Sequence, residues 1–204
     1  MRFLKILDSR YAELILGFFL TGLVGSLLTH QFQQEDWKCT ARHEIFKKRL
    51  DESRNIVDTV MHHSRKRFYS MQKIYWALER YDVAGADSMW DEYQRIVDDW
   101  NVAVGGYRCN LKATLSPRLA YHLLDSENAV NYKQRESLHA EFVVAHQKLK
   151  KFKEWQNGSQ GERRQIELDA LSALRSLAVR IDTFSEACLT AIMARDEVLM
   201  ATCR

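Results

Sequence analysis

Apolar residues follow two distinct patterns along this chain. Over residues 14–28 they cover every side of a helix, and no charged residue interrupts them. Farther along, apolar residues recur at spacings of three and four, which places them on one face of a helix. The sequence has 1 proline and 8 glycines in 204 residues, so helix breakers are rare. Together these patterns predict an all-α fold.

The N-terminal apolar run, residues 12–30, is predicted to be a single transmembrane helix. Residues 11–29 make up 19 positions, close to the roughly 20 that cross a bilayer. A helix that is apolar on all sides needs either lipid or the centre of a large protein, and 204 residues give little room for the second. Two alternatives stay open. One is a cleaved signal peptide, although no A-x-A-like site follows the run, and the other is a core helix of a soluble bundle.

The charges around the run predict on which side of the membrane the rest of the chain lies. Three Lys or Arg residues precede it and none occurs between Thr29 and Trp37, which favours a C-terminal domain outside the cytoplasm. The basic residues from Lys38 onward oppose this orientation. The predicted organisation is an N-terminal flank, a transmembrane helix and a helical bundle domain, over residues 1–11, 12–30 and 31–204 respectively.

Small residues recur every four positions within the run, at Gly17, Thr21 and Gly25. Such a ladder lets two transmembrane helices approach closely, so we predict an association face there. The alternative is that Gly and Thr are simply frequent in membrane helices.

The membrane helix is predicted to continue directly into the first long helix, because nothing between Ser26 and Ala84 breaks a helix. The first turn signal is VAGADS, residues 83–88, with Asp87 or Ser88 as the N-cap of the next helix. The predicted apolar face of the first helix consists of Phe46, Leu50, Val57, Val60, Phe68, Met71, Tyr75 and Leu78.

Three more long helices and one short corner helix are predicted after this turn. Ser116 and Pro117 match the N-cap and first position of the short helix, and Asp125-Ser126 is the predicted start of the next long one. A turn at residues 157–161 precedes the last helix. Each of the three long helices has a predicted apolar face. That of the second long helix is Trp90, Tyr93, Val97, Trp100, Val104, Tyr107 and Leu111, and that of the third is Leu138, Phe142, Ala145, Leu149 and Phe152. The face of the last helix is Leu171, Leu174, Ala178, Ile181, Ser185, Cys188 and Ile192. We therefore predict an up-down-up-down four-helix bundle with long first and last helices.

The four cysteines have no C-x-x-C spacing of the kind that binds zinc. Counted from the turns, Cys39 and Cys203 lie at similar heights on the first and last helices, which are neighbours in this topology. A Cys39–Cys203 disulfide is compatible with these heights in an oxidising compartment, but the sequence favours the alternative of four reduced thiols, with Cys188 as a small core residue.

The sequence shows no motif for catalysis. Glu136-x-x-His139 is similar to half of a carboxylate-bridged metal site, but no second copy exists, so we expect no metal and no cofactor. Neither a nucleophile elbow nor a phosphate-binding loop is present, which predicts a non-enzymatic protein. The net charge of +3 lacks the concentrated basic excess of nucleic-acid-binding proteins.

Two segments are rich in aromatic residues, KRFYSMQKIYWALERYD at 66–82 and WDEYQRIVDDWN at 90–101. They loosely resemble bacterial proteins of uncharacterised function that have an N-terminal membrane helix and a helical domain. That resemblance implies no activity. We separately expect the chain to lie in a bacterial inner membrane. The aromatic residues are candidates for a ligand or partner surface, with core packing as the alternative. They are Tyr69, Tyr75, Trp76, Trp90, Tyr93 and Trp100.

Three functions are compatible with these features. The first is a membrane-anchored scaffold or interaction module that meets the lipid bilayer and a protein partner or a second copy. The second is a sensor or ligand-binding bundle that uses the aromatic-rich region and relays through a partner. The third is an enzyme whose site is dispersed over several helices, although no sequence motif supports this function.

Overall fold

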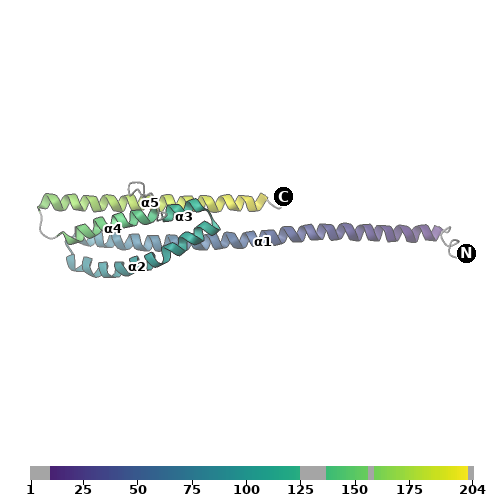
Figure 1. The fold of residues 1–204 in the computed structure, drawn as a ribbon, viewed down its shortest axis with the longest axis horizontal. Helices are drawn as coiled ribbons and strands as arrows, with labels where there is room; N and C mark the ends of the chain where they lie inside the picture. The colour runs from purple at the N-terminus through teal and green to yellow at the C-terminus, as the bar shows by residue number, and fades with distance from the viewer. Residues whose placement is uncertain (1–9, 125–136, 156–158, 202–204) are drawn as a thin grey trace. The chain divides into compact units, whose positions relative to one another are not determined.

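The computed structural model describes residues 10–124, 137–155 and 159–201, with side chains over 16–198 of these ranges. In this part of the chain every regular element is an α-helix (Figure 1). The helices are α1 (Arg10–Glu79), α2 (Val83–Thr114), α3 (Pro117–Leu123), α4 (Leu138–Glu154) and α5 (Gln160–Ala201). The all-α prediction is confirmed, and so is the continuation of the N-terminal run into the first long helix.

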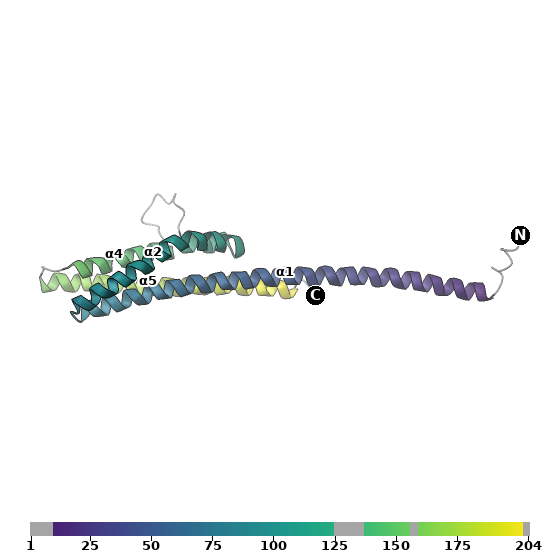
Figure 2. The ribbon, with the colours of Figure 1, turned by 90° about the horizontal axis from the view of Figure 1, so that it is seen from below.

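The chain divides into two compact units, one of residues 48–198 and one of residues 1–47 with 199–204. In the larger unit, α1, α2, α4 and α5 lie alongside one another, as both views show (Figures 1 and 2). Side-chain hydrogen bonds identify the neighbours as α1–α2, α2–α4, α4–α5 and α5–α1. Examples are Tyr107 with His63, Trp100 with His139, Lys148 with Asp169, and Arg54 with Asp196.

The buried face of α1 has an unbroken heptad spacing through this unit. Its positions alternate by three and four over Leu50, Ser53, Val57, Val60, Ser64, Arg67, Met71, Ile74 and Leu78. The sequence prediction omitted Ser53, Ser64 and Arg67 because polar residues seldom occupy a core position. The predicted face instead included Phe68, whose side chain is only half-buried. The geometry of the helix, rather than residue polarity, decides which side chains enter the core.

The core faces of the other helices largely match the predicted ones. All five predicted residues of α4 are buried, and the α2 face is buried except for the half-buried Trp90 and Tyr107. On α5 the predicted Leu171, Ala178 and Ser185 are half-buried. The buried face of α5 comprises Ile166, Ala170, Leu174, Leu177, Ile181, Phe184, Cys188 and Ile192.

The first turn lies earlier than predicted. Helix α1 ends at Glu79 and α2 begins at Val83, so Asp87 and Ser88 are helical residues and not caps. Asp82 is the N-cap, and its carboxylate accepts a hydrogen bond from the Gly85 N–H at 2.9 Å. Tyr81 has a φ of 63°, a left-handed conformation in which glycine is more usual. Because a tyrosine makes this turn, no glycine marks its position in the sequence.

The third long helix is also shorter than predicted. Helix α4 begins at Leu138 after an N-cap at Ser137, whose hydroxyl accepts from the Ala140 N–H at 3.2 Å. It has 17 residues against 32 in α2. The predicted start at Asp125-Ser126 lies outside the described residues. The short corner helix is confirmed, with Ser116 as its N-cap and proline at its first position.

Among the residues that the structure describes, no helix is both long enough and apolar enough to cross a membrane. The side chains of residues 12–15, at the start of the predicted span, are outside the described part. The transmembrane prediction is therefore not confirmed.

Candidate functional site

Three polar residues occupy core positions on α1, and two of them satisfy their hydrogen bonds locally. The Ser64 hydroxyl donates to the Val60 carbonyl at 2.8 Å. The Ser53 hydroxyl donates to the Arg49 carbonyl at 2.8 Å and also approaches the Thr114 carbonyl of α2 at 3.3 Å. A serine that bonds to the carbonyl four residues earlier is compatible with a helix interior. The third residue, Arg67, differs from both.

Arg67 places a guanidinium in the middle of the larger unit, with only 2% of the residue exposed. Its central carbon lies 4.5 Å from the ring centre of Phe142 on α4 and 5.8 Å from that of Trp100 on α2. Both distances fall in the range of cation–π attraction. Its Nε and Nη1 atoms are buried, and no acceptor from the described residues bonds to either.

Tyr93 connects Arg67 to α4. This tyrosine of α2 lies beside Arg67 and opposes the lowering of its pKa, and its hydroxyl lies 3.0 Å from Nδ1 of His146. The lowered pKa of His146 favours the neutral imidazole. With its proton on Nε2, that imidazole accepts from the tyrosine hydroxyl through Nδ1.

A second hydrogen bond also connects α2 to α4. Trp100 Nε1 donates to Nδ1 of His139 at 3.0 Å. An indole N–H cannot accept, so this histidine also presents an unprotonated Nδ1. The Trp100 ring lies 5.2 Å from Phe142 and the Trp90 ring lies 5.3 Å from His146, centre to centre. The buried cluster of Arg67, Tyr93, Trp100, Phe142 and His146 is called the arginine cluster below.

Burial dominates the acid–base behaviour of the arginine cluster. Desolvation lowers the pKa of Arg67, although Tyr93 acts in the opposite direction. Desolvation raises the pKa of the Tyr93 hydroxyl, against the influence of Arg67. For His146, burial and then the charges of Arg67 and Lys150 lower the pKa. The cluster thus contains one buried cation, a neutral phenol and a neutral imidazole.

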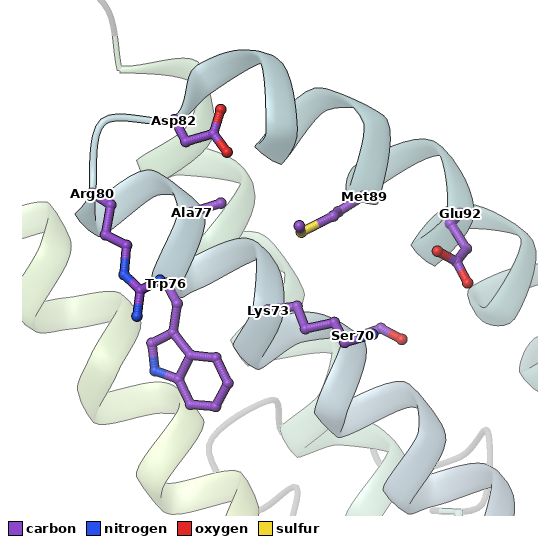
Figure 3. A pocket seen from close by; sticks show the side chains of 8 residues that line it. All are labelled: Ser70, Lys73, Trp76, Ala77, Arg80, Asp82, Met89 and Glu92. Carbon is purple, nitrogen blue, oxygen red and sulfur yellow. The ribbon is translucent and has the colours of Figure 1, made fainter.

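A separate hollow opens on the surface between α1 and α2, close to their turn (Figure 3). It has a volume of about 380 Å³. In Figure 3, Met89 and Glu92 point from α2 toward α1, while Trp76 and Arg80 project from α1 beside each other. The lining residues are Ser70, Lys73, Trp76, Ala77, Arg80, Asp82, Met89 and Glu92. We call this hollow the distal pocket.

The six aromatic residues predicted to form one surface are divided between core and exterior. Tyr75, Tyr93 and Trp100 are buried, and Trp90 is partly buried against them. Only Tyr69 and Trp76 are exposed, and only Trp76 lines the distal pocket. Tyr75, Tyr93 and Trp100 thus follow the core-packing alternative, and a ligand or partner surface stays a prediction for Tyr69 and Trp76. The helical period turns neighbouring aromatic residues of one segment to opposite sides, and most of them enter the core.

The predicted association face is an open helix surface. A Cβ atom added at Gly17 or Gly25 would meet nothing within 4 Å, apart from the helix's own nearby backbone. Thr21, the middle residue of the ladder, donates its hydroxyl to the Gly17 carbonyl at 2.7 Å. Association through this face stays a prediction.

The cysteines differ from one another in state. Cys39 takes part in a disulfide, whereas Cys109 is an exposed free thiol and Cys188 a buried one. Cys203 is outside the described residues, so its predicted bond with Cys39 stays a prediction.

The Glu136-x-x-His139 spacing, at which no metal is expected, lies only partly within the described residues. Glu136 is outside the described residues, and Nδ1 of His139 accepts from Trp100. Across the part of the chain that the structure describes, no three His, Cys, Asp or Glu residues gather in a way that would hold a metal ion.

Sequence reasoning missed Arg67 and His146, the two most informative residues of the arginine cluster. One signal was available for the first. Extending the heptad of α1 from Val60 by four and then three positions reaches Ser64 and Arg67, so the spacing alone places an arginine in the core. No family model, curated protein or solved structure matches this chain.

Proposed function

We propose that this protein is a membrane-anchored, non-enzymatic helical interaction module. Residues 12–30 form the transmembrane helix, and the larger unit is an up-down-up-down four-helix bundle. The observation that carries the proposal is the surface of α1 over residues 16–32. Its large apolar side chains are half or more exposed on every side of the helix: Leu16, Phe18, Phe19, Leu20, Leu23, Val24, Leu27, Leu28 and Phe32. An apolar surface of this extent indicates lipid or another protein around it.

The polar groups of this stretch suit a lipid environment as well. The Thr21 and Thr29 hydroxyls donate to the carbonyls of Gly17 and Gly25 at 2.7 and 2.8 Å. A bilayer offers no water to satisfy such groups, so hydrogen bonds within the helix are required there. These contacts support a helix surrounded by lipid.

The hydrogen bonds between helices support the four-helix topology. Each of the four long helices is bonded to two others, in the cyclic order α1, α2, α4, α5. An up-down-up-down bundle has these neighbours, because consecutive helices pack side by side and the last returns to the first. The disulfide at Cys39 supports a position outside the cytoplasm, where such bonds persist.

Membrane fractionation of the full chain tests the anchor. Wild-type protein is expected in the membrane fraction after an alkaline carbonate wash. The double variant Leu20→Arg/Val24→Arg should move to the soluble fraction, because two charges at the bilayer centre oppose insertion. The control variant Val102→Arg/Val179→Arg replaces two exposed apolar residues of the larger unit and should stay with the membrane. Wild-type protein in the soluble fraction would contradict the proposal.

The distal pocket favours a second candidate function, a ligand-binding bundle. The hollow combines an exposed indole and a thioether with two cationic side chains, Lys73 and Arg80. Two carboxylates also line it, and that of Asp82 is engaged as the N-cap of α2 while that of Glu92 lies on the α2 side. This combination suits an aromatic carboxylate, whose ring stacks on Trp76 while its charge meets a cation.

Saturation-transfer NMR with benzoate as the probe tests the second function on the full chain. Wild type should give a ring signal that Trp76→Ala abolishes. Trp37→Ala removes an exposed tryptophan of the smaller unit and should leave the signal intact. An equal signal from Trp76→Ala would exclude the distal pocket as the binding site.

A further inference from the structure

The charge of Arg67 has no visible counterpart. Its Nε and Nη1 are buried, and no acidic side chain among the described residues forms an ion pair with it. Buried polar groups in folded proteins are almost always hydrogen-bonded, and a buried charge is normally paired. Within the described part of the chain, the buried Arg67 therefore has no partner for its charge and none for its Nε and Nη1 donors.

The surroundings of Arg67 define the chemistry of that partner. Phe142 and Trp100 face the guanidinium within cation–π distance, and such contacts use its flat face. The N–H donors point outward in the plane of the group, where hydrogen-bond acceptors are needed. The ionisable groups packed around it are neutral Tyr93 from α2 and neutral His146 from α4, and Lys150 adds a further positive charge near His146. A water molecule would satisfy the donors but would leave the positive charge unbalanced.

The space around the guanidinium limits the size of the partner. Four large side chains near it are each at most 1% exposed: Trp100, Tyr93, Phe142 and Met71. Interiors of this kind are close-packed, and a bulky ligand has no room beside them.

We propose that the arginine cluster is a binding site for a compact monovalent anion, either chloride or a small carboxylate such as formate. The anion accepts hydrogen bonds from Nε or Nη1 of Arg67 and neutralises its charge. Charge-assisted bonds of this type are among the stronger hydrogen bonds in proteins. The residues of the site come from α1, α2 and α4, so a bound anion stabilises the packing of these three helices. This inference goes beyond both proposed functions and does not depend on the membrane anchor or on the distal pocket.

Thermal unfolding of the full chain in detergent tests this site. An anion that binds only the folded protein raises Tm in a saturable way as its concentration increases. We expect chloride and formate to raise Tm when each replaces gluconate, a bulky anion, at constant ionic strength. Arg67→Met keeps the length and packing of the side chain without its charge and should abolish the response. Arg65→Met removes an exposed arginine two residues away and should respond like wild type.

Two outcomes would overturn the proposal. One is an equal Tm in chloride, formate and gluconate for wild type, and the other is an unchanged response in Arg67→Met. A direct measurement covers the case in which that variant fails to fold. Wild-type protein should broaden the ³⁵Cl resonance, and formate should reverse the broadening by competition. Broadening that formate leaves untouched, or no broadening at all, would count against the site.

Discussion

The Tyr93 hydroxyl lies 3.0 Å from Nδ1 of His146 and ties α2 to α4 inside the core. The lowered pKa of His146 favours a neutral imidazole, and with the proton on Nε2 its Nδ1 accepts from the tyrosine hydroxyl. Protonation of His146 would remove the acceptor and add a second positive charge beside a buried guanidinium. The bond therefore makes the stability of the larger unit sensitive to pH.

We predict that the free energy of unfolding falls as the pH drops below about 6.5, the ordinary pKa of histidine. Burial and the nearby cations lower the pKa of His146 in the folded state. The unfolded chain therefore binds the proton first, and stability declines from pH 6.5 down to the folded-state pKa. The slope from one such group is at most about 1.4 kcal/mol per pH unit. Urea unfolding of the full chain between pH 7.5 and 5 measures it.

His146→Gln identifies the source of that slope. A glutamine amide still accepts a hydrogen bond but does not titrate, so the slope should become shallower. His62→Gln, at an exposed histidine of α1, serves as the control and should behave as wild type. An unchanged slope in His146→Gln would assign the effect to other groups.

Gly85 is predicted to resist replacement although it lies within a helix. A Cβ atom there would come 2.1 Å from an Asp82 carboxylate oxygen, and this carboxylate is the N-cap of α2. Gly85→Ala should therefore cost about 1 kcal/mol, the usual value of a lost cap. Gly106→Ala is the matched control, because nothing lies within 4 Å of its Cβ position. That change should stabilise by about 0.5–1 kcal/mol through helix propensity.

Urea unfolding of both alanine variants measures the two changes in the free energy of unfolding. The two changes are chemically identical and lie in the same helix, so only the local surroundings differ. Equal stabilisation by Gly85→Ala and Gly106→Ala would show that the cap at Asp82 contributes nothing.

The free thiols are predicted to differ sharply in reactivity. Burial raises the pKa of Cys188 to about 12, so almost no thiolate exists at pH 8, whereas Cys109 is exposed. A maleimide should label Cys109 within minutes and Cys188 only after unfolding. Mass spectrometry of labelled peptides gives the two rates, and Cys109→Ser should remove the fast one. Fast labelling of Cys188 in folded protein would contradict the core position of that residue.

The same thiol reports the orientation of the bundle. A maleimide that cannot cross membranes should label Cys109 in cells whose outer membrane alone has been opened. Labelling that requires rupture of the inner membrane would place the bundle on the cytoplasmic side.

The sequence was most informative where apolar spacing alone determines structure. The face of α4 from Leu138 to Phe152 was predicted without error, and so was the capping of the short helix by Ser116. The first turn was placed too late, because Tyr81 adopts the left-handed conformation that a glycine usually signals. Gly85 suggested a turn but instead makes room for the Asp82 cap. Local composition therefore misplaced the helix ends, whereas periodicity located the helices.

The arginine cluster could not be predicted from the sequence for a different reason. Assigning core positions by polarity excludes Arg67, although the heptad of α1 includes it. Partners such as His146 become visible only once three helices have been packed, because they lie 53 or more residues away from Tyr93 and Arg67 in sequence.

Association through the Gly17, Thr21 and Gly25 face is the last prediction. Small residues permit close approach of two membrane helices, so a large side chain in the ladder should separate them. Gly25→Leu places such a side chain where the structure leaves open space, so the fold of the single chain should not change. Leu23→Phe is the control, since it adds bulk at an exposed position on the opposite side of the helix. Energy transfer between labelled chains in lipid vesicles should fall in Gly25→Leu and persist in Leu23→Phe. Equal transfer in both variants would mean that this face does not mediate contact between copies, and the small residues would then reflect only their general frequency in membrane helices.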